Sequence, residues 1–318
     1  MRILITGGSG YIGSRLVETL SDRREVEKIV ICDLVSPKHT NPKVEYTRAD
    51  VRDGSGIKAL LERHRIDCLI HLAFILDPIH DEARMYDVDV NGTESVLRAA
   101  SEAGTQQVLV TSSASAYGAF ADNPKPITEE WPVRGAPDFS YARDKAEADR
   151  VCQLWAANHP DRRIAIVRPC IVMGPSVDNY IARGWTKAPF MPILDGVDEE
   201  FQLVHEDDVV SALIALLDTR ASGPYNLAGD GLMTWRHSAE LIGLKTREIS
   251  MKRMRKIAGL TWRLKLSSAD APPGNLEFLR HPWVVSTDKL KRDTDWQPRY
   301  DCEQTFRIAM EAKGKPFV

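Results

Sequence analysis

The sequence lacks a hydrophobic run long enough to cross a membrane. A transmembrane helix needs about 18 or more consecutive apolar residues, and no such run occurs in the chain of 318 residues. The apolar start at residues 1–6 gives way to glycine too early for the core of a signal peptide. From these two absences we expect a soluble, cytoplasmic protein without a membrane partner.

The sequence also has little net charge and few cysteines. Its 42 basic and 45 acidic residues leave a net charge of -3, which gives no electrostatic reason to expect a nucleic acid or an anionic membrane as partner. The five cysteines are an odd number, are widely spaced and include no Cys-x-x-Cys pair. We therefore expect buried thiols rather than disulfides or a metal site, and small molecules as partners.

The stretch that organises the chain is residues 6–13, Thr-Gly-Gly-Ser-Gly-Tyr-Ile-Gly, which lies between an apolar run and an amphipathic segment. A strand, a glycine turn and a helix in this order are typical of dinucleotide-binding domains. Their glycines allow a tight turn, close approach of a pyrophosphate and close packing of helix on strand. Gly8, Gly10 and Gly13 match this pattern, and the phosphates would lie at the N-terminus of the helix that begins at Tyr11.

Asp33 lies about 20 residues beyond the last of these glycines, at the end of the apolar run 29–32. A carboxylate there accepts hydrogen bonds from the ribose hydroxyls of adenosine and repels a 2′-phosphate. Leu34 follows where a basic residue would help to bind NADP, so the sequence favours NAD. Asp50, which follows the third predicted strand, either contacts the adenine amino group or belongs to an ordinary polar loop.

Strand and helix signals alternate along the first half of the chain. This alternation predicts an α/β fold: a Rossmann-type doubly wound parallel sheet with helices on both faces and a smaller C-terminal substrate lobe. The predicted strands are 3–6, 28–32, 44–47, 67–71, 107–111 and 163–168, and the predicted helices are 11–21, 56–65, 81–103 and 140–158.

The rhythm stops after Gly174-Pro175, which suggests a division of the chain into two parts. We expect residues 1–175 to form the dinucleotide-binding domain, to which residues 201–228 return with a strand at 201–205 and a helix at 206–217. The glycine- and proline-containing stretch 176–200 predicts a lid or substrate loop. It would form the substrate lobe together with residues 229–318, where helices are expected near 237–242 and 251–264.

Tyr141 and Lys145 are four residues apart in the predicted helix 140–158, so their side chains share a face. A phenol with an ordinary pKa of about 10 is a poor base at neutral pH, but a nearby ammonium and an oxidised nicotinamide favour the phenolate. Tyr141 would then accept the hydroxyl proton as hydride leaves the substrate carbon, or return it in the reduction. Ser113, just after the predicted strand 107–111, is expected to hydrogen-bond the same substrate oxygen.

In this order the motifs resemble the extended short-chain dehydrogenase/reductase family, the group of NAD-dependent sugar epimerases and dehydratases. The similarity covers most of the first 230 residues or so. It is carried by the Thr-Gly-x-x-Gly-x-x-Gly loop at 6–13, Asp33, Asp50-Val51, His71-Leu72-Ala73, Asn91-Gly92-Thr93, Ser112-Ser113 leading to Tyr117-Gly118, Tyr141 with Lys145, Arg168-Pro169, Gly174-Pro175, and Val204-His205 with Asp208.

The resemblance implies that NAD is the cofactor, that Ser113, Tyr141 and Lys145 are the catalytic residues, and that no metal is needed. It also implies a homodimer formed through the long helices around 81–103 and 140–158. The residues that the resemblance and the glycine loop place along the cofactor are Gly7, Gly10, Tyr11, Ile12, Gly13, Asp33, Asp50, Val51, Leu72, Ala73, Tyr141, Lys145 and Pro169.

The sequence departs from the family where a nucleotide diphosphate would be held. Members that act on nucleotide-diphosphate sugars carry a basic residue before the strand of the His-x-x-Asp segment, and another near an Arg-Pro-Gly turn late in the chain. Here those places hold Phe201-Gln202 and Pro272-Pro273-Gly274. Losing two charge-assisted hydrogen bonds costs roughly 3–6 kcal/mol of affinity. We therefore expect a substrate without a diphosphate handle.

Apolar side chains near the site are expected to line a pocket or simply to pack in the core. They are Phe74, Ile75, Trp185, Phe190, Met191, Phe201 and Trp235. Two features are still compatible with a sugar-nucleotide substrate. Asn179 lies where the epimerases use an asparagine near the diphosphate. The basic run 252–256 could reach an anionic substrate, although such a run is usually a solvated helix face. The predicted substrate contacts are Phe74, Ser115, Asn179 and Phe201.

Three functions are compatible with these patterns. The leading hypothesis is an NAD-dependent oxidoreductase of the epimerase/dehydratase type, which transfers hydride between NAD and a secondary alcohol or ketone without a nucleotide-diphosphate handle. The first alternative is a UDP-sugar 4-epimerase, since the same three residues serve both reactions. The second is a non-catalytic dinucleotide-sensing protein, and the presence of all three catalytic residues argues against it.

Overall fold

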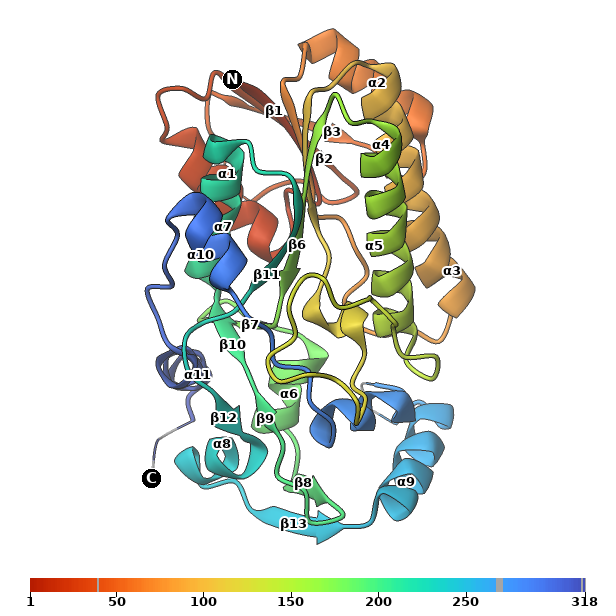
Figure 1. Ribbon diagram of the computed structural model, residues 1–318, viewed down its shortest axis with the longest axis vertical. Coiled ribbons are helices and arrows are strands. Elements are labelled where there is room, and N and C mark those ends of the chain that lie inside the picture. Colours follow the sequence, from red (N-terminus) through yellow and green to blue (C-terminus); the bar gives the residue numbers. More distant parts are fainter. Residues whose placement is uncertain (39, 267–270, 316, 318) are drawn as a thin grey trace.

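The central sheet has seven strands in the order β11-β6-β5-β4-β1-β2-β3, and each neighbouring pair is parallel. The computed structural model describes residues 1–38, 40–266, 271–315 and 317. The order of the strands reverses at β1, which has β2 on one side and β4 on the other (Figure 1). The strands are β1 (Arg2–Thr6), β2 (Lys28–Asp33), β3 (Val44–Arg48), β4 (Cys68–His71), β5 (Gln107–Thr111), β6 (Arg163–Pro169) and β11 (Gly223–Leu227).

Helices cover both faces of this sheet, because successive residues of the inner strands point to opposite sides. In β1, Ile3 and Ile5 belong to the hydrophobic cluster that includes Leu16 of α1, whereas Leu4 belongs to the cluster that includes Ile57 of α2. On one side lie α1 (Tyr11–Ser21), α7 (Glu206–Thr219) and α10 (Asp288–Thr294), and on the other α2 (Gly54–His64), α4 (Gly92–Glu102) and α5 (Ser140–Asn158). The predicted Rossmann-type sheet is thereby confirmed.

The long helix predicted at 81–103 is interrupted. It consists of α3 (Glu82–Tyr86), a π-helical turn η1 (Asp87–Asn91) and α4. A π turn inserts an extra residue into a helix and is frequent at functional sites. In this turn Asp89 is fully buried, and its carboxylate accepts a hydrogen bond from the N–H of Ile75 at 2.8 Å. Hydrophobic periodicity alone does not reveal such an interruption.

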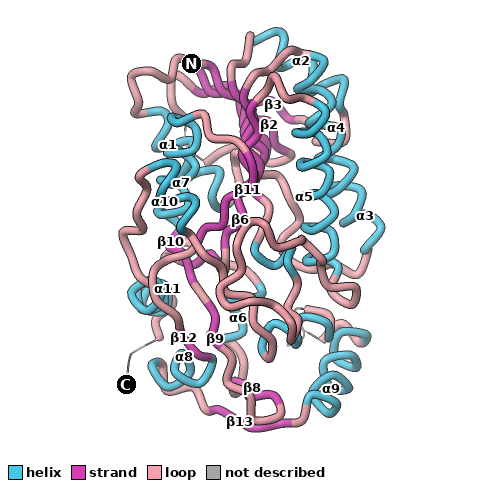
Figure 2. Tube along the Cα trace, viewed as in Figure 1, coloured by secondary structure: helices cyan, strands magenta, loops and turns pink. Residues whose placement is uncertain are grey.

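The remaining elements lie beyond the carboxyl ends of the central strands and include three short two-stranded sheets (Figure 2). These sheets pair β10 with β7, β12 with β9 and β13 with β8. The elements are the 3₁₀ helix η2 (Ala114–Tyr117), β7 (Ile171–Met173), α6 (Tyr180–Thr186), β8 (Met191–Leu194), β9 (Glu200–Phe201), β10 (Leu203–His205), β12 (Met233–Thr234), α8 (Trp235–Leu241), β13 (Thr246–Ile249), α9 (Met251–Arg263), the 3₁₀ helix η3 (Pro273–Leu279) and α11 (Cys302–Ala312).

Two local predictions are wrong in this region. The single strand expected at 201–205 is divided at Gln202 into β9 and β10, because the side chain of Gln202 bonds the backbone of Val285 while the two strands pair with different partners. The stretch 176–200, expected to be a loop, contains α6 and β8. In the late part of the chain, α10 packs on α7 and β11. The division into two domains and the homodimer stay predictions.

The five cysteines are all free and buried, as expected. Burial raises the pKa of each thiol, and that of Cys32 rises to about 12. Among the described helices, none is both long and apolar enough to cross a membrane. Within the same described ranges, no group of three or more histidine, cysteine, aspartate or glutamate residues is arranged to hold a metal ion.

Candidate active site

A cavity of about 690 Å³ opens where the central strands β1, β2, β4 and β5 end. In open parallel sheets ligands bind in the crevice where the strand order reverses, which here is at β1. The cavity is lined by the predicted residues Gly7, Gly10, Tyr11, Ile12, Gly13, Asp33, Asp50, Val51, Leu72, Ala73, Phe74, Ser113, Ser115, Tyr141, Lys145, Pro169 and Asn179. The structure therefore brings together every predicted site residue except Phe201.

The glycine turn fits the backbone so closely that side chains are excluded. Gly7 has a φ of +71°, and a Cβ on it would lie 2.6 Å from the backbone nitrogen of Ala73. A Cβ on Gly13 would lie 2.2 Å from the carbonyl oxygen of Gly7. Gly8, counted in the pattern from its spacing, does not line the cavity, and a Cβ there would meet only the side chain of Ile31 and the Ile5 carbonyl at 3.0 Å or more. Gly7 thus forms the tight turn.

The N-terminus of α1 opens into the cavity. Its cap residue is Gly10, so no side chain hydrogen-bonds the first N–H groups of the helix, and Tyr11, Ile12 and Gly13 all line the cavity. A helix N-terminus with free N–H groups is an anion-binding site. The hydroxyl of Tyr11 donates to the buried carboxylate of Glu206. Burial is the main cause of the raised pKa of Tyr11, and this hydrogen bond raises it further.

At the adenosine end of the cavity the charged residues are Asp33, Asp50, Arg52 and Arg84. Asp33 accepts hydrogen bonds from the N–H groups of Ser9, at 3.0 Å, and Val35, at 3.1 Å, so it also ties the glycine turn to the end of β2. Asp50 forms an ion pair with Arg52 at 2.7 Å, which lowers the pKa of Asp50. Both interpretations of Asp50 therefore remain open, and the two arginines were not foreseen.

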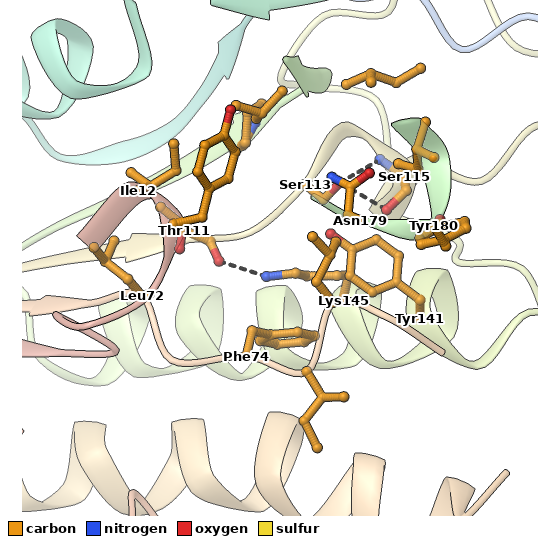
Figure 3. A pocket seen from close by; sticks show the side chains of 18 of the residues that line it. Ile12, Leu72, Phe74, Thr111, Ser113, Ser115, Tyr141, Lys145, Asn179 and Tyr180 are labelled. Carbon is orange, nitrogen blue, oxygen red and sulfur yellow. Dashed lines mark hydrogen bonds between the residues drawn. The ribbon is translucent and has the colours of Figure 1, made fainter. Parts of the chain in front are cut away.

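The three predicted catalytic residues converge in the middle of the cavity (Figure 3). Tyr141 and Lys145 lie on α5, and Ser113 follows β5 as the cap residue of η2. The hydroxyl of Ser113 accepts hydrogen bonds from the N–H and the hydroxyl of Ser115 at 3.1 and 2.8 Å. The ammonium of Lys145 donates to the carbonyl of Thr111 at 2.9 Å and lies 3.3 Å from the centroid of the Phe74 ring.

In the chain without bound NAD, the charge of Lys145 does not lower the pKa of Tyr141. Burial raises the pKa of Tyr141, a hydrogen bond with Ser113 opposes the rise, and the charge of Asp89 adds to it. The ammonium of Lys145 lies 6.0 Å from the centroid of the Tyr141 ring and is directed to Thr111 instead. Without a bound nicotinamide the pKa of Tyr141 is therefore raised, and the lowering expected in the NAD-bound enzyme stays a prediction.

Behind the cavity lining lies the buried carboxylate of Asp89, which was not singled out from the sequence. One of its oxygens accepts the N–H of Ile75, and the other has no hydrogen-bond partner among the described residues. Burial raises the pKa of Asp89 and lowers that of Lys145, while the two opposite charges favour each other. The only sequence signal was its position two residues before the Asn91-Gly92-Thr93 motif.

The other end of the cavity is apolar. Its lining includes Phe74, Ile75, Leu76, Phe139, Ile171, Val172, Tyr180, Trp185, Phe190, Met191, Trp235, Phe278, Leu279 and Trp283, with Asn179 and Asn275 as amide groups. Within the described part of the chain, the lysine and arginine residues that line the cavity are Arg52, Arg84 and Lys145. Arg52 and Arg84 both act on Asp50 at the adenosine end. Among the described lining residues Lys145, beside Phe74, is therefore the one cation near the apolar end, and its ammonium hydrogen-bonds the carbonyl of Thr111.

Of the groups considered for the substrate, Phe201 differs from expectation, whereas Asn179 and the basic run 252–256 lie where the sequence allowed them to lie. Phe201 is completely buried and stacks on Trp235 with 4.1 Å between ring centroids, so it packs behind the cavity wall and contacts no ligand there. Asn179 lines the cavity but also caps α6 by accepting the N–H of Ala182 at 2.9 Å. The basic run 252–256 lies on α9 and does not line the cavity.

Comparison with known proteins agrees with this architecture. The sequence profile of the NAD dependent epimerase/dehydratase family matches residues 3–228. The chain belongs to this family. As a member it is an enzyme and takes NAD as its cofactor.

Individual relatives are distant. An uncharacterized protein, y4nG, from Sinorhizobium fredii (strain NBRC 101917 / NGR234) is 27% identical over 95% of this chain and 76% of its own length. UDP-glucuronic acid decarboxylase 1 from Arabidopsis thaliana is 28% identical over 99% of this chain and 72% of its own length. The structure of a Thermotoga maritima UDP-glucose 4-epimerase, solved with UDP-glucose, shares the fold with a TM-score of 0.75 at 20% identity, and 99% of each chain is covered.

The cavity of this epimerase/dehydratase-family enzyme fits NAD at three points. The cradle of Gly7 and Gly13 has no room for a Cβ, the uncapped N-terminus of α1 suits a pyrophosphate, and the carboxylate of Asp33 lies where the adenosine ribose would bind. These features come from the first 33 residues of the chain, which is why the sequence foresaw them. The sequence did not predict that Asn275, Phe278 and Trp283 form part of the cavity wall. The segment that contains them has no hydrophobic periodicity that would indicate its position in the fold.

Replacing Asp33 by asparagine should shift the cofactor preference toward NADP. The amide oxygen of the introduced asparagine would still accept one of the two N–H groups that the two oxygens of Asp33 accept, while the negative charge that repels a 2′-phosphate is lost. We expect the ratio of NADP affinity to NAD affinity to rise by about tenfold or more, equivalent to about 1.4 kcal/mol. Fluorescence titration of the parent and of Asp33→Asn with both dinucleotides measures this ratio, and an unchanged ratio would contradict the role of Asp33.

His71, at the end of β4, should make the enzyme less stable in acid. Its Nδ1 lies 2.6 Å from the hydroxyl of Thr6, and its Nε2 lies 3.0 Å from that of Thr93. The hydroxyl of Thr93 already donates to the carbonyl of Asp89, so His71 donates through Nε2 and accepts at Nδ1. Burial, with the charge of Lys145, lowers the pKa of His71 from 6.5 to about 3.

The folded protein therefore leaves His71 neutral below pH 6.5, whereas the unfolded chain takes up the proton. Stability is lost as the pH falls from the unfolded pKa toward the folded one, by about 2 kcal/mol between pH 6.5 and 5. Urea unfolding of the parent and of His71→Gln at pH 7 and pH 5 tests this. The parent should lose about 2 kcal/mol more than the variant over this interval, and equal losses would refute the assignment.

Proposed function

We propose that this enzyme exchanges hydride between NAD and a secondary alcohol or ketone that has no nucleotide-diphosphate handle. The observation that carries the proposal is the apolar end of the cavity, where the described lining residues include no lysine or arginine except Lys145, whose ammonium hydrogen-bonds the carbonyl of Thr111. Because a diphosphate without a cation partner forfeits charge-assisted hydrogen bonds of about 1.5–3 kcal/mol each, such substrates would bind weakly.

In this proposal Tyr141 is the acid/base. NAD, when bound, supplies the hydride acceptor. The hydroxyl of Tyr141 and that of Ser113 both face the same part of the cavity, so they can hold one substrate oxygen between them. In the oxidation the phenolate of Tyr141, which the charge of a bound oxidised nicotinamide would favour, would accept the proton of that oxygen, and in the reduction the phenol would return it. Lys145 would hold the nicotinamide ribose, while Thr111 and Phe74 fix its ammonium at the cavity wall.

Surrounding aromatic and aliphatic side chains support a substrate that is largely apolar next to the reacting carbon. Phe74 lies edge-on to Tyr141 with 6.1 Å between ring centroids, and Phe139 lies 5.9 Å from Tyr141 on another side. These rings exclude water from the phenol, which strengthens its hydrogen bond to a substrate oxygen. Asn179 and Asn275 are the amide groups left to recognise a polar substituent.

A UDP-sugar 4-epimerase is the second candidate. Asn179 favours it, because this asparagine lines the cavity at the place where the resemblance puts a diphosphate ligand. The names of the Arabidopsis and Thermotoga proteins also point to UDP-sugars. A dinucleotide sensor without chemistry is disfavoured, since Ser113, Tyr141 and Lys145 all line one cavity.

The test is a substrate panel with the NAD-loaded enzyme. Neutral secondary alcohols of increasing apolar size are compared with UDP-glucose and UDP-galactose, and both NADH absorbance and sugar interconversion are followed. Our proposal expects NADH from at least one neutral alcohol and no change in the UDP-sugars. Interconversion of UDP-glucose and UDP-galactose without net NADH would replace the proposal by the epimerase.

A further inference from the structure

The helix α9 and the three residues after it form a local concentration of positive charge. Residues 251–266 contain no aspartate or glutamate, although the whole chain has a net charge of -3. Arg255 is neutralised by Asp138 and Glu277, at 3.3 and 3.0 Å. The other basic residues of the segment make no ion pair with any residue in the described ranges: Lys252, Arg253, Lys256, Arg263 and Lys265.

The same helix exposes an apolar stripe. Ile257, Leu260 and Leu264 recur at helical spacing and so share one face, with side chains that are 43%, 59% and 57% exposed. A different face holds α9 on the protein, since Met251 and Met254 pack against Leu194 in a small hydrophobic cluster. The exposed stripe is therefore not required for attaching the helix.

Basic and apolar residues are arranged side by side on the exposed part of α9. Lys252, Lys256 and Arg263 recur at positions i, i+4 and i+11, which places them in one strip next to the apolar stripe. Helices with an apolar face and a lysine- and arginine-rich polar face lie in the interface of anionic membranes, with the apolar side chains inserted and the cations among the headgroups. If α9 bound an apolar groove of another protein instead, the apolar stripe would suffice and the unpaired basic residues beside it would have no role.

We propose that α9 docks the enzyme on an anionic lipid surface. The net charge of the whole chain, -3, gave no reason to expect lipid binding. A net charge does not reveal a short segment, such as 251–266, whose charged residues are all basic. Figure 1 shows α9 at the outer edge of the molecule, at the end that also carries β8 and β13. A flat surface can reach the helix there.

Docking through α9 would bring the apolar end of the cavity close to the lipid. The helix packs on η3, whose Asn275, Phe278 and Leu279 line the cavity. Near the C-terminal end of α9, Trp262 stacks on His80, with 4.0 Å between ring centroids, in the segment that follows the cavity residues 74–76. Binding to lipid does not depend on which substrate the enzyme takes, so it can be tested without one.

The test is flotation of the full-length, NAD-loaded enzyme with large unilamellar vesicles. Phosphatidylcholine vesicles are compared with vesicles of phosphatidylcholine and phosphatidylglycerol at low and high salt. We expect binding only to the anionic vesicles and a decrease as salt rises. Removing three charges with Lys252→Gln, Lys256→Gln and Arg263→Gln should lower the partition coefficient about 100-fold, from about 1 kcal/mol per charge.

Two matched controls separate α9 from general charge and general hydrophobicity. Arg24→Gln with Arg48→Gln and Arg63→Gln removes the same charge from exposed positions elsewhere, and Leu232→Gln removes another exposed leucine. Neither should change the partition coefficient by more than about twofold. The combined variant Ile257→Gln, Leu260→Gln and Leu264→Gln should lower it at least tenfold. Equal NAD affinity and circular dichroism spectra establish that each variant is folded.

Three outcomes would overturn the proposal. One is equal binding of the parent to neutral and anionic vesicles, or no binding to either. Another is a charge variant of α9 that binds as the parent does. The third is a parent that self-associates in sedimentation velocity without binding vesicles, and whose self-association is lost in the Ile257, Leu260 and Leu264 variant, which would make α9 a contact between copies of this chain.

Discussion

A Tyr141→Phe variant should bind NAD as tightly as the parent and lose about 10²- to 10⁴-fold in kcat, the range for removal of a general acid/base. Tyr141 is 8% exposed and lies against Phe74 and Phe139, so the phenyl ring of the variant fills the same space. What disappears is the hydroxyl that exchanges the proton with the substrate oxygen. The measurement is steady-state turnover of the alcohol found in the substrate panel, together with calorimetric titration of NAD.

The matched control is Tyr180→Phe. Tyr180 lines the same cavity, is equally buried and also has a pKa raised by burial. Unlike Tyr141, it has no lysine four residues later in the sequence. Its loss should change kcat by less than about tenfold, because it removes at most a hydrogen bond of about 0.5–1.5 kcal/mol. A Tyr141→Phe enzyme that works at the parent rate would show that another group moves the proton.

Gly13→Ala should weaken NAD binding strongly. The added Cβ would lie 2.2 Å from the carbonyl oxygen of Gly7 and 2.8 Å from the Cα of Gly8, both of which are backbone atoms. The glycine turn or the start of α1 must shift, and overpacking of this kind costs about 1–3 kcal/mol. If this cost falls on the NAD-bound state, the affinity for NAD decreases roughly 5- to 150-fold. Calorimetric titration with NAD measures the decrease.

Gly259→Ala provides the control for Gly13→Ala. Gly259 lies inside α9, and the nearest atom to an added Cβ is a side-chain carbon of Pro273 at 3.8 Å. Alanine there should raise the stability by about 0.5–1 kcal/mol, since glycine is a poor residue inside a helix, and should leave NAD affinity unchanged. Equal NAD affinity in Gly13→Ala and Gly259→Ala would contradict the role of the glycine turn.

The parts of the site that the sequence predicted are encoded by neighbouring residues. The turn requires glycine at Gly7, where φ is +71°, and at Gly13, where a Cβ would meet the carbonyl oxygen of Gly7, and Asp33 ends a strand whose inner residues are buried on both faces. Tyr141 and Lys145 share a helix face by their spacing alone. Such features need no knowledge of distant contacts, and the parallel sheet follows from the alternation of strands and helices.

The parts that were missed depend on contacts between distant segments. The position of the Lys145 ammonium is decided by Thr111 and Phe74 in other parts of the chain, which the spacing along one helix does not reveal. Phe201 is removed from the cavity by its stacking on Trp235. In each case the residue types were read correctly from the sequence, but their partners were set by tertiary packing.

The central claim is that the substrate of this family member has no nucleotide-diphosphate handle. The most direct measurement is calorimetric titration of UDP and of dTDP into the NAD-loaded enzyme. Because the described residues that line the apolar end of the cavity include no lysine or arginine except Lys145, which hydrogen-bonds Thr111, neither ligand should bind detectably. Micromolar binding of either one would contradict the account and would make a nucleotide-sugar epimerase, with Asn179 at the diphosphate, the better description.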